Sequence, residues 1–282
     1  MMNGAVLKTG LIGRSILASR SPWLHEQEGR AQGLDLDYEL FDFTERGLAD
    51  GELGPLLRRL AADGLCGVNI TFPFKQTVGP LLDELAACAE AVGAVNTVAM
   101  RGGRLIGYNT DKTGFEDGLR EGLPGAALDR VLQLGAGGAG AAVGSALLSL
   151  GVRELVLLDV DPARAGALAD RLCAQYGADR AIARGRAEID THAIDGIVNT
   201  TPMGMASNPG MAIAPGLIQP RHWVADIVYF PIETELLRTA SALGCRVLDG
   251  SGMVIGQAAA AFEIFTGCKA DKARMRASFA QG

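Results

Sequence analysis

The hydrophobic pattern of this chain alternates between two periods. Short, continuous apolar runs are typical of buried strands, and longer stretches with apolar residues at helical spacing separate them. We expect strands at residues 9–13, 38–43, 67–71, 97–100 and 105–108, and helices at residues 21–32, 53–63, 81–89 and 113–121. Gly102 and Gly103 lie between the last two of these strands, which predicts a hairpin. The first third of the chain therefore predicts an α/β domain with a mostly parallel sheet and a hairpin.

A glycine-rich segment near the middle of the chain carries the strongest motif. A strand from Val131 runs into Gly135-Ala136-Gly137-Gly138-Ala139-Gly140, an apolar helix follows at residues 141–150, and a strand at residues 155–158 ends at Asp159. This order of strand, Gly-x-Gly-x-x-Gly, helix, strand and acid is that of a dinucleotide-binding βαβ unit. Gly135 allows a tight turn, Gly137 lets the backbone approach a pyrophosphate, and Gly140 lets the helix pack close to the strand.

The residue after the second strand indicates which dinucleotide binds. A carboxylate at this position accepts hydrogen bonds from ribose hydroxyls and repels a 2′-phosphate. Val160, Asp161 and Pro162 follow Asp159, so no arginine comes immediately after it to neutralise such a phosphate. Arg164, one turn further on, could reach the adenine face or be an ordinary solvated helix residue. The sequence therefore predicts NAD rather than NADP.

Further strands are expected beyond this unit, and the chain ends in helices. The strands lie at residues 196–199, 223–227 and 247–248, and the helices at residues 256–266 and 272–279. Because these helices follow the last strand, we expect them to pack back on the first domain. A cleft between the two lobes would then hold the reactive site.

Composition excludes several classes of function. The net charge is −6 with scattered basic residues, which argues against nucleic acid and anionic membranes as partners. Neither a long apolar run nor a signal peptide is present, so we expect a cytoplasmic protein. The five cysteines are widely spaced without a Cys-x-x-Cys pair, and the three histidines are dispersed, so no metal site is expected.

Two segments of the first domain combine polar residues in a way that suggests chemistry. Ser19 and Ser21 precede a helix; Ser21 alone would serve as its cap, whereas the pair could bind a carboxylate. Asn69, Thr71 and Lys75 follow a strand, where side chains face the ligand crevice of α/β sheets. Lys75 is either a solvated lysine or an acid–base group for a hydroxyl.

Two further polar segments lie nearby in the sequence. Asn96 follows Ala91-Val-Gly-Ala-Val95, and Asn109-Thr-Asp111 follows the hairpin. Turn chemistry explains any one of these residues. Several amides and a carboxylate at successive strand ends suggest hydrogen bonds to a polyol.

Taken in order, these segments resemble the shikimate dehydrogenase family along essentially the whole chain. The matching motifs are Ser19-x-Ser21-Pro, Asn69-x-Thr71-x-Pro73-x-Lys75, Gly93-Ala-Val-Asn96-Thr, Asn109-Thr-Asp111, Gly135-Ala-Gly-Gly-Ala, Asn199-Thr-Thr-Pro-Met-Gly204, Asp226-x-Val-Tyr229-x-Pro231-x-x-Thr234 and Gly256-Gln257-Ala258. The resemblance implies a two-lobed α/β protein. Residues 1–111 and 246–282 would form the substrate-binding catalytic domain, and residues 112–245 the NAD-binding Rossmann domain.

The resemblance also implies roles for individual residues. Lys75 and Asp111 would be the catalytic pair. The substrate, a cyclohexane or cyclohexene carboxylate, would be bound by Ser19, Ser21, Asn69, Thr71, Asn96, Tyr229 and Gln257. Beyond the glycine-rich segment, Asp159 and Arg164, the implied cofactor contacts are Thr200, Pro202, Met203, Val228, Gly250 and Met253.

Departures from the family pattern point to a subgroup. Ser15 and Ala18 replace a proline and a histidine, Glu26 replaces an asparagine, Asp159-Val-Asp161 replaces Asn-Arg-Thr of the NADP enzymes, and Gly256 replaces a tyrosine. Together they resemble the NAD-preferring quinate/shikimate dehydrogenases. The expected reaction is reversible hydride transfer between NAD and a ring hydroxyl of shikimate or quinate.

Alternatives stay open at this point. They are an aminoshikimate-type dehydrogenase of secondary metabolism and a non-catalytic NAD-binding sensor. Retention of both Lys75 and Asp111 argues against the sensor. The sequence decides neither the preferred polyol nor the oligomeric state, and a homodimer is compatible with it.

Overall fold

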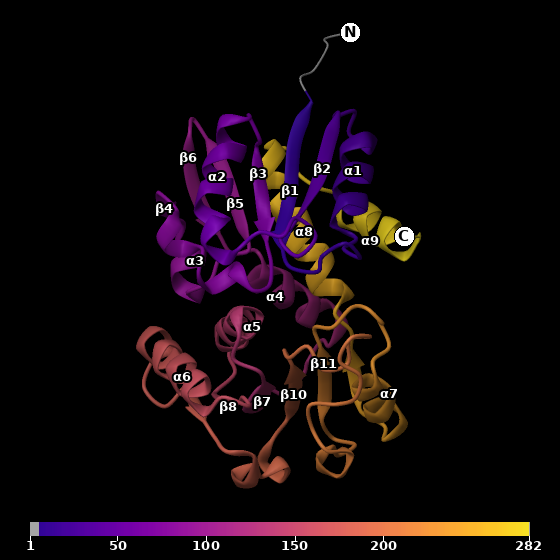
Figure 1. Cartoon of the computed structure of the whole chain (residues 1–282). Coiled ribbons are helices and arrows are strands. Elements are labelled where there is room, and N and C mark those ends of the chain that lie inside the picture. The colour runs from indigo at the N-terminus through magenta and orange to yellow at the C-terminus, as the bar shows by residue number, and fades with distance from the viewer. Residues whose placement is uncertain (1–5, 282) are drawn as a thin grey trace. The chain divides into compact units, whose positions relative to one another are not determined.

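The computed structural model describes residues 6–281 and divides the chain into two compact units. The first comprises the described residues up to Thr110 and again from Ile255, and the second is Asp111–Val254 (Figure 1). No helix in residues 6–281 is long and apolar enough to cross a membrane.

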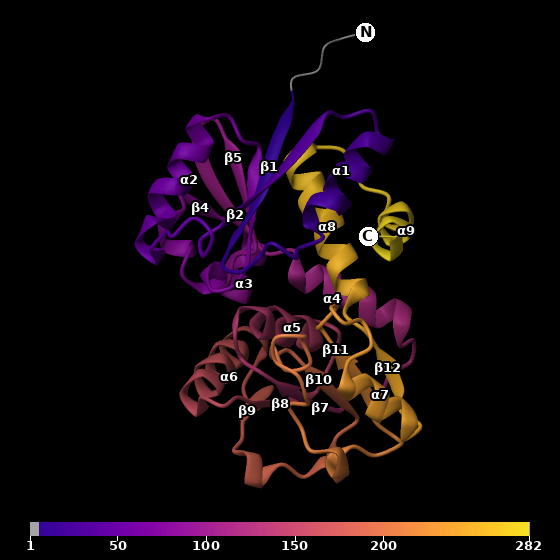
Figure 2. The same cartoon turned by 45° about the vertical axis from the view of Figure 1, so that its right-hand side comes forward.

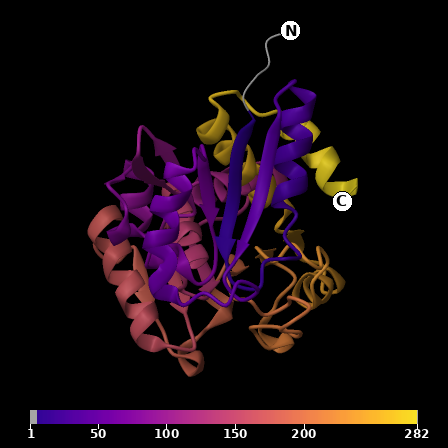
Figure 3. The same cartoon turned by 45° about the horizontal axis from the view of Figure 1, so that its top comes forward.

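The first unit is built on a six-stranded sheet with the order β2-β1-β3-β5-β6-β4. Its strands are β1 (Leu7–Gly13), β2 (Leu36–Asp42), β3 (Gly67–Ile70), β4 (Glu84–Leu85), β5 (Thr97–Arg101) and β6 (Arg104–Tyr108). β1 runs parallel to β2 and β3, and β4 runs parallel to β6, whereas β5 is antiparallel to both of its neighbours. The indigo strands of Figure 3 are the paired β1 and β2. The predicted mostly parallel sheet with a hairpin is confirmed.

Helices cover both faces of this sheet (Figure 2). They are α1 (Ser21–Ala31), α2 (Leu53–Ala62), α3 (Ala87–Val92), α8 (Ser251–Thr266) and α9 (Lys272–Gln281). Leu57 of α2 belongs to the same buried cluster as Ile12 and Val68 of the strands. On the opposite face, the ring of His25 in α1 lies 4.8 Å from that of Tyr38 and 5.9 Å from that of Phe265 in α8.

The last helices return to the first domain, as the sequence predicts, and the C-terminal helix α9 packs on α1. Trp23 Nε1 donates a hydrogen bond of 3.0 Å to the carbonyl oxygen of Ser278. The guanidinium of Arg274 lies 2.7 Å from the carboxylate of the buried Glu28. Burial raises the pKa of Glu28, but hydrogen bonds from Arg274, from the Asp271 backbone and from a glutamine outweigh this and leave it lowered. These contacts tie the two ends of the chain together in one unit.

The second unit has a fully parallel sheet with the order β12-β11-β10-β7-β8-β9. Its strands are β7 (Arg130–Leu134), β8 (Glu154–Leu158), β9 (Ala181–Ala183), β10 (Gly196–Asn199), β11 (Trp223–Asp226) and β12 (Arg246–Leu248), and its helices are α4 (Asp111–Gly122), α5 (Gly138–Ser149), α6 (Pro162–Tyr176) and α7 (Glu235–Ala242). This is the Rossmann strand order, and the chain reverses direction across the sheet between β7 and β10. Ligands of such sheets bind outside the carboxyl ends of the strands at that point.

Two expectations about the elements are wrong. Residues 81–89 do not form a helix: β4 pairs with β6, and α3 begins only at Ala87. The first domain does not resume at residue 246 either, because β12 pairs with β11 and the second unit extends to Val254. Both errors arise from strand pairings that join distant parts of the sequence.

Candidate active site

The glycine-rich segment forms the turn between β7 and α5. Gly135 has a φ of 101°, which residues with a Cβ rarely adopt, and an added Cβ would lie 2.8 Å from Thr200 Oγ1. A Cβ on Gly140 would lie 2.5 Å from the carbonyl oxygen of Gly135. The first turn of α5 can approach the strand end only because both residues are glycine.

The same turn leaves one side open for a ligand. Gly137 is the N-cap of α5, and a Cβ added there would meet no atom of the described chain within 4 Å. Gln133 Nε2 donates hydrogen bonds to the carbonyl oxygens of Gly135 (2.8 Å) and Gly140 (2.9 Å), so both carbonyls have a donor inside the protein. The free N–H groups and the positive dipole end of α5 are what a pyrophosphate requires. Gln133 was not singled out from the sequence, because its role depends on the closed turn.

Asp159 lies beside this turn at the carboxyl end of β8. Its side chain is 6 % exposed and accepts hydrogen bonds from the backbone N–H groups of Ala136 (2.7 Å) and Asp161 (2.9 Å). The guanidinium of Arg164 lies 3.7 Å from the carboxylate of Asp159 and 3.7 Å from that of Asp161. No arginine follows Asp159 directly in the sequence, but Arg164, one turn further on, lies beside it in the structure. The helix turn from Asp161 brings the guanidinium back to the strand end.

The loop after β10 is held by a buried carboxylate in β11. Asp226 accepts hydrogen bonds from Asn199 Nδ2 (2.9 Å), from the Thr234 hydroxyl (2.7 Å) and from the Val228 backbone (3.0 Å). Burial raises the pKa of Asp226, although these three hydrogen bonds act in the opposite direction. Asn199 Nδ2 also donates to the carbonyl oxygen of Met203 at 2.9 Å. This cluster shapes the segment that contains the predicted cofactor contacts Thr200, Pro202 and Met203.

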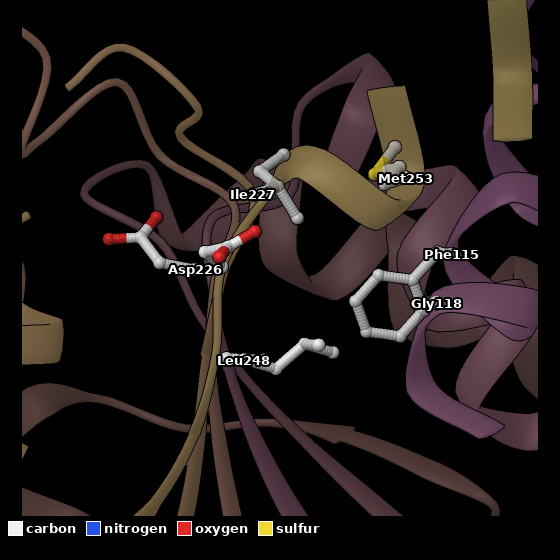
Figure 4. A pocket seen from close by; sticks show the side chains of 9 residues that line it. Phe115, Gly118, Asp226, Ile227, Leu248 and Met253 are labelled. Atoms are coloured by element: carbon white, nitrogen blue, oxygen red, sulfur yellow. The ribbon is translucent and has the colours of Figure 1, made fainter. Parts of the chain in front are cut away.

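The remaining predicted cofactor contacts come together at the ends of β11 and β12. A Cβ on Gly250 would lie 2.8 Å from the carbonyl oxygen of Val228, so these two backbones are in close contact. Gly250 and Met253 line a small cavity of the second unit together with Phe115, Gly118, Ala225, Asp226, Ile227, Leu248 and Asp249 (Figure 4). Its volume of about 10 Å³ suits nothing larger than a water molecule.

In the first unit, the predicted substrate residues gather at one edge of the sheet. β1, β3 and β6 run in the same direction and β5 runs against them. The carboxyl ends of β1, β3 and β6 with the segments that follow them, and the segment before β5, therefore lie at the same edge. Those segments contain Ser19 and Ser21, Asn69 to Lys75, Asn96, and Asn109 to Thr110.

Ser21 does not cap α1, so that part of the prediction is wrong. The N-cap is Arg20, no side chain caps the helix, and Ser21 is its first residue. The Ser21 backbone N–H instead donates to Ser19 Oγ at 3.3 Å, and the Ser19 hydroxyl donates to Ser21 Oγ at 3.2 Å. This direction of hydrogen bonding leaves the hydroxyl hydrogen of Ser21 available to an acceptor.

A carboxylate that the sequence analysis missed organises the loop before these serines. Asp42, at the end of β2, accepts hydrogen bonds from the backbone N–H groups of Ser15 (3.0 Å), Ile16 (2.7 Å) and Thr44 (2.9 Å). Burial raises the pKa of Asp42, but the backbone hydrogen bonds, that of Ile16 first, outweigh it and leave the pKa lowered. Ile16 then accepts from the Ser19 backbone at 2.9 Å. No sequence motif signals this role.

The predicted catalytic residues occupy well-defined positions in separate units. Lys75 lies in a single 3-10 turn, Phe74–Gln76. Its backbone carbonyl accepts a hydrogen bond of 2.7 Å from the backbone N–H of Val95. Asp111 is the first residue of α4 and is 4 % exposed. Tyr229 belongs to the second unit, whereas Gln257 of α8 belongs to the first, and both are half-buried.

Comparison with known proteins identifies the family. Residues 11–98 match the model described as the shikimate dehydrogenase substrate binding domain, and residues 250–278 match the shikimate 5′-dehydrogenase C-terminal domain. A shikimate dehydrogenase (NADP(+)) of Pseudarthrobacter chlorophenolicus is 50 % identical over 96 % of this chain and 93 % of its own length. The chain belongs to the shikimate dehydrogenase family.

Further relatives include both quinate/shikimate and shikimate dehydrogenases, named with either NAD or NADP. A quinate/shikimate dehydrogenase (NAD(+)) of Corynebacterium efficiens is 49 % identical over 99 % of both chains. The solved quinate dehydrogenase of Corynebacterium glutamicum in complex with NAD matches with a TM-score of 0.91 at 45 % identity, over 98 % of this chain and 99 % of that one. A solved shikimate dehydrogenase in complex with NADP⁺ matches with a TM-score of 0.90 at 30 % identity, over 100 % and 97 %.

These relatives share a cofactor type but differ in the individual cofactor. The protein is therefore an oxidoreductase of the shikimate/quinate dehydrogenase kind that uses a nicotinamide dinucleotide, and its relatives are named for both NAD and NADP. Neither the sensor nor the aminoshikimate alternative gains support from them. The choice between NAD and NADP rests on the residues of this chain.

Proposed function

We propose that this protein is an NAD-dependent dehydrogenase that interconverts a ring hydroxyl of shikimate or quinate and the corresponding ketone, 3-dehydroshikimate or 3-dehydroquinate. The observation that carries the proposal is the carboxylate of Asp159 beside an open glycine-rich turn at the end of β8. It is supported by full-length similarity to proteins named as quinate/shikimate dehydrogenases.

Local charge favours NAD over NADP. The end of β8 combines two carboxylates, Asp159 and Asp161, with the guanidinium of Arg164 at 3.7 Å from each. The three side chains together carry a net charge of about −1, so a 2′-phosphate would meet a negative environment. Ribose hydroxyls can instead donate to Asp159, whose two backbone hydrogen bonds leave further lone pairs. We propose that Arg164 contacts the adenosine side of the cofactor.

The carboxylate of the substrate is assigned to the two serines before α1. Ser19 accepts from the backbone and donates to Ser21, so Ser21 is left as the donor. The positive dipole end of this eleven-residue helix also stabilises an anion that is bound at its start. Ser21 would therefore donate to the substrate carboxylate while Ser19 orients it.

Lys75 and Asp111 are assigned to the proton of the reacting hydroxyl. NAD, when bound, supplies the hydride acceptor. The chain must take the hydroxyl proton as the hydride leaves, and a lysine with a carboxylate is a suitable acid–base pair. Asn69, Thr71, Asn96, Tyr229 and Gln257 are assigned to the polar groups of the ring.

The test is a spectrophotometric assay of NADH formation. Purified protein should reduce NAD with shikimate and with quinate, and should reduce NADP less efficiently. Lys75→Ala should lower turnover by ~10²–10⁴-fold, the usual contribution of a positioned acid–base group. NAD affinity should be unchanged, because Lys75 lies outside the unit that contains the glycine-rich turn.

Lys8→Ala provides the matched control. Lys8 is an exposed lysine of the same unit, and its removal should leave turnover unchanged. Near-normal turnover of Lys75→Ala would remove Lys75 from the proposed chemistry. Absence of turnover on both acids in the unmodified protein would refute the proposed substrates.

A further inference from the structure

A chain of side-chain hydrogen bonds runs across the first sheet and includes two of the predicted substrate residues, Asn69 and Asn96. The Tyr38 hydroxyl in β2 donates to Asn69 Oδ1 at 2.7 Å, and Asn69 Nδ2 donates to Thr97 Oγ1 at 3.0 Å. The Thr97 hydroxyl donates to Asn96 Oδ1 at 3.0 Å, and Asn96 Nδ2 donates to Thr110 Oγ1 at 2.9 Å. All five residues are at most 6 % exposed. Buried polar chains of this kind restrict each member to one orientation.

Backbone groups determine which way round the two asparagine amides lie. The carbonyl oxygen of Asn96 can only accept, and it lies 3.3 Å from the donor Asn69 Nδ2. The backbone N–H of Thr110 can only donate, and it lies 2.9 Å from the acceptor Asn96 Oδ1. Turning either amide over would place donor against donor or acceptor against acceptor. The amide orientations therefore follow from groups that cannot exchange roles.

The remaining hydrogen-bonding capacity of the two amides is different. Asn69 Nδ2 uses both hydrogens, on Asn96 O and Thr97 Oγ1, while its Oδ1 accepts from Tyr38 and keeps one lone pair. Asn96 Oδ1 accepts from Thr97 and Thr110. Among the described residues, Asn96 Nδ2 donates to Thr110 alone and so keeps one hydrogen. Asn69 can only accept from a ligand, and Asn96 can only donate.

We infer that Tyr38 and Thr97 are positioning residues, which hold Asn69 as an acceptor and Asn96 as a donor for the hydroxyls of the substrate ring. This inference rests on the proposed function. A hydroxyl group satisfies both amides because it donates one hydrogen and accepts another. An ammonium group can donate to Asn69 but cannot accept from Asn96. The site therefore selects a hydroxyl over an amine, which separates this protein from a dehydrogenase of amino-substituted rings.

The first experiment removes one oxygen atom from the chain of hydrogen bonds. Tyr38→Phe removes one of the three hydrogen bonds that hold the Asn69 amide, the one to Oδ1, so the acceptor is positioned less precisely. Ring hydroxyls are bound both before and during hydride transfer, so the loss should appear in KM rather than kcat. We expect KM for shikimate to rise about tenfold, the equivalent of roughly one net hydrogen bond. The kcat and the KM for NAD should stay within about twofold of the unmodified values.

Tyr108→Phe is the matched control. Tyr108 is the last residue of β6 in the same unit, and its hydroxyl is not part of the hydrogen-bonded chain. Its removal should change neither KM nor kcat. If Tyr38→Phe behaves as Tyr108→Phe does, in a protein that oxidises shikimate or quinate, the positioning role is refuted while the proposed function stands.

Thr97 offers a second test with its own rescue. Thr97→Val keeps the shape but removes the hydroxyl, so it should raise KM at least as much as Tyr38→Phe. Thr97→Ser keeps the hydroxyl and should restore KM to within about twofold of the unmodified value. A serine variant as impaired as the valine variant, with an unchanged Tm, would show that the methyl group rather than the hydroxyl matters and would overturn the inference.

A double-mutant cycle asks whether Tyr38 acts through Asn69. Adding Tyr38→Phe to Asn69→Ala should have no further effect on KM, because the group that Tyr38 holds is already absent. Additive effects would refute the proposed connection. An unmodified protein that oxidises neither acid would refute the proposed function and this inference together, which distinguishes that outcome from the others.

Discussion

Replacement of His25 by an apolar residue should reduce the loss of folding stability between pH 7 and pH 5 by about 2 kcal/mol. His25 is 1 % exposed, packs against the rings of Tyr38, Phe262 and Phe265, and has no hydrogen-bond partner for Nδ1 among the described residues. Burial lowers its pKa from 6.5 to about 3. The folded protein therefore keeps this ring neutral under conditions in which the unfolded chain takes up a proton.

The sign and size of the effect follow from this difference. Below pH 6.5 the unfolded state binds one proton more than the folded state, so the free energy of unfolding falls as the pH falls, until the folded pKa is reached. At 1.36 kcal/mol per pH unit, the 1.5 units between pH 6.5 and pH 5 correspond to about 2 kcal/mol. A loss of that size is a large part of the stability of an ordinary domain.

Urea denaturation followed by circular dichroism between pH 5 and pH 7.5 measures the effect. His25→Phe and His25→Leu should each show a free energy of unfolding that depends on pH less steeply than that of the unmodified protein, by about 2 kcal/mol over this interval. Packing changes introduced by either side chain shift the whole curve but not its slope. The lowered pKa of His222, caused first by burial, acts in all variants and cancels.

Leu57→Val is the control for a change in packing. Leu57 is fully buried in the core on the α2 face of the same sheet and carries no titratable group, so its replacement should lower the whole curve without changing its slope. Curves for His25→Phe and His25→Leu that run parallel to that of the unmodified protein would show that the buried ring does not resist protonation. The reasoning from burial would then be refuted.

Four further predictions concern the cofactor, the substrate, the start of α1 and the loop before it. Asp159→Asn with Val160→Arg should shift kcat/KM towards NADP by roughly 10–100-fold, since a carboxylate is removed and a cation added at a side chain that is 94 % exposed; an unmodified protein that already uses NADP as well as NAD would contradict this. Ser21→Thr should move the shikimate-to-quinate ratio of kcat/KM towards quinate, because a β-branched hydroxyl is more restricted; equal ratios would remove Ser21 as the selector. Ser21→Ala should leave Tm unchanged, since Ser21 caps no helix. Asp42→Asn should lower the free energy of unfolding, measured by urea denaturation, by about 2 kcal/mol, because an amide nitrogen would face a backbone N–H. The folded state lowers the pKa of Asp42, so its carboxylate stabilises the protein fully above the unfolded pKa. The difference between the two proteins should disappear as the pH falls through the lowered pKa of the folded carboxyl.

Local rules were sufficient for much of this molecule. The turn at Gly135 needs a positive φ, and the approach at Gly140 leaves no space for a Cβ. The dinucleotide motif could therefore be recognised from these glycines together with the strand, helix, strand and acid around them. Short apolar runs predicted most strands of both sheets, because the residues that bury a strand are neighbours in the sequence. The polar residues at the ends of β1, β3 and β6 lie at one edge of the first sheet, since strands that run in the same direction place their carboxyl ends together.

Local rules failed where distant segments compete with them. Residues 81–89 have a helical pattern, yet β4 forms there because β6 supplies a partner, and Asp83 accepts from the Leu105 backbone at 2.7 Å. Ser21 has the sequence signature of a cap, but Ser19 provides an acceptor for its backbone, and the helix begins without one. In both cases a hydrogen bond made after folding decides between two locally acceptable structures.

By itself, the sequence determined the Rossmann order of elements, the glycine-rich turn, the acid at the end of β8 and the hydroxyls and amides offered at the edge of the first sheet. Only the tertiary structure decided how those polar groups are oriented. Asn69 is an acceptor because the backbone carbonyl of Asn96, 27 residues away in sequence, takes a hydrogen of its amide, and because Tyr38 and Thr97, 31 and 28 residues away, hold that orientation. A side-chain amide has two equivalent ends until neighbours distinguish them, and those neighbours are brought together only when the strands pair.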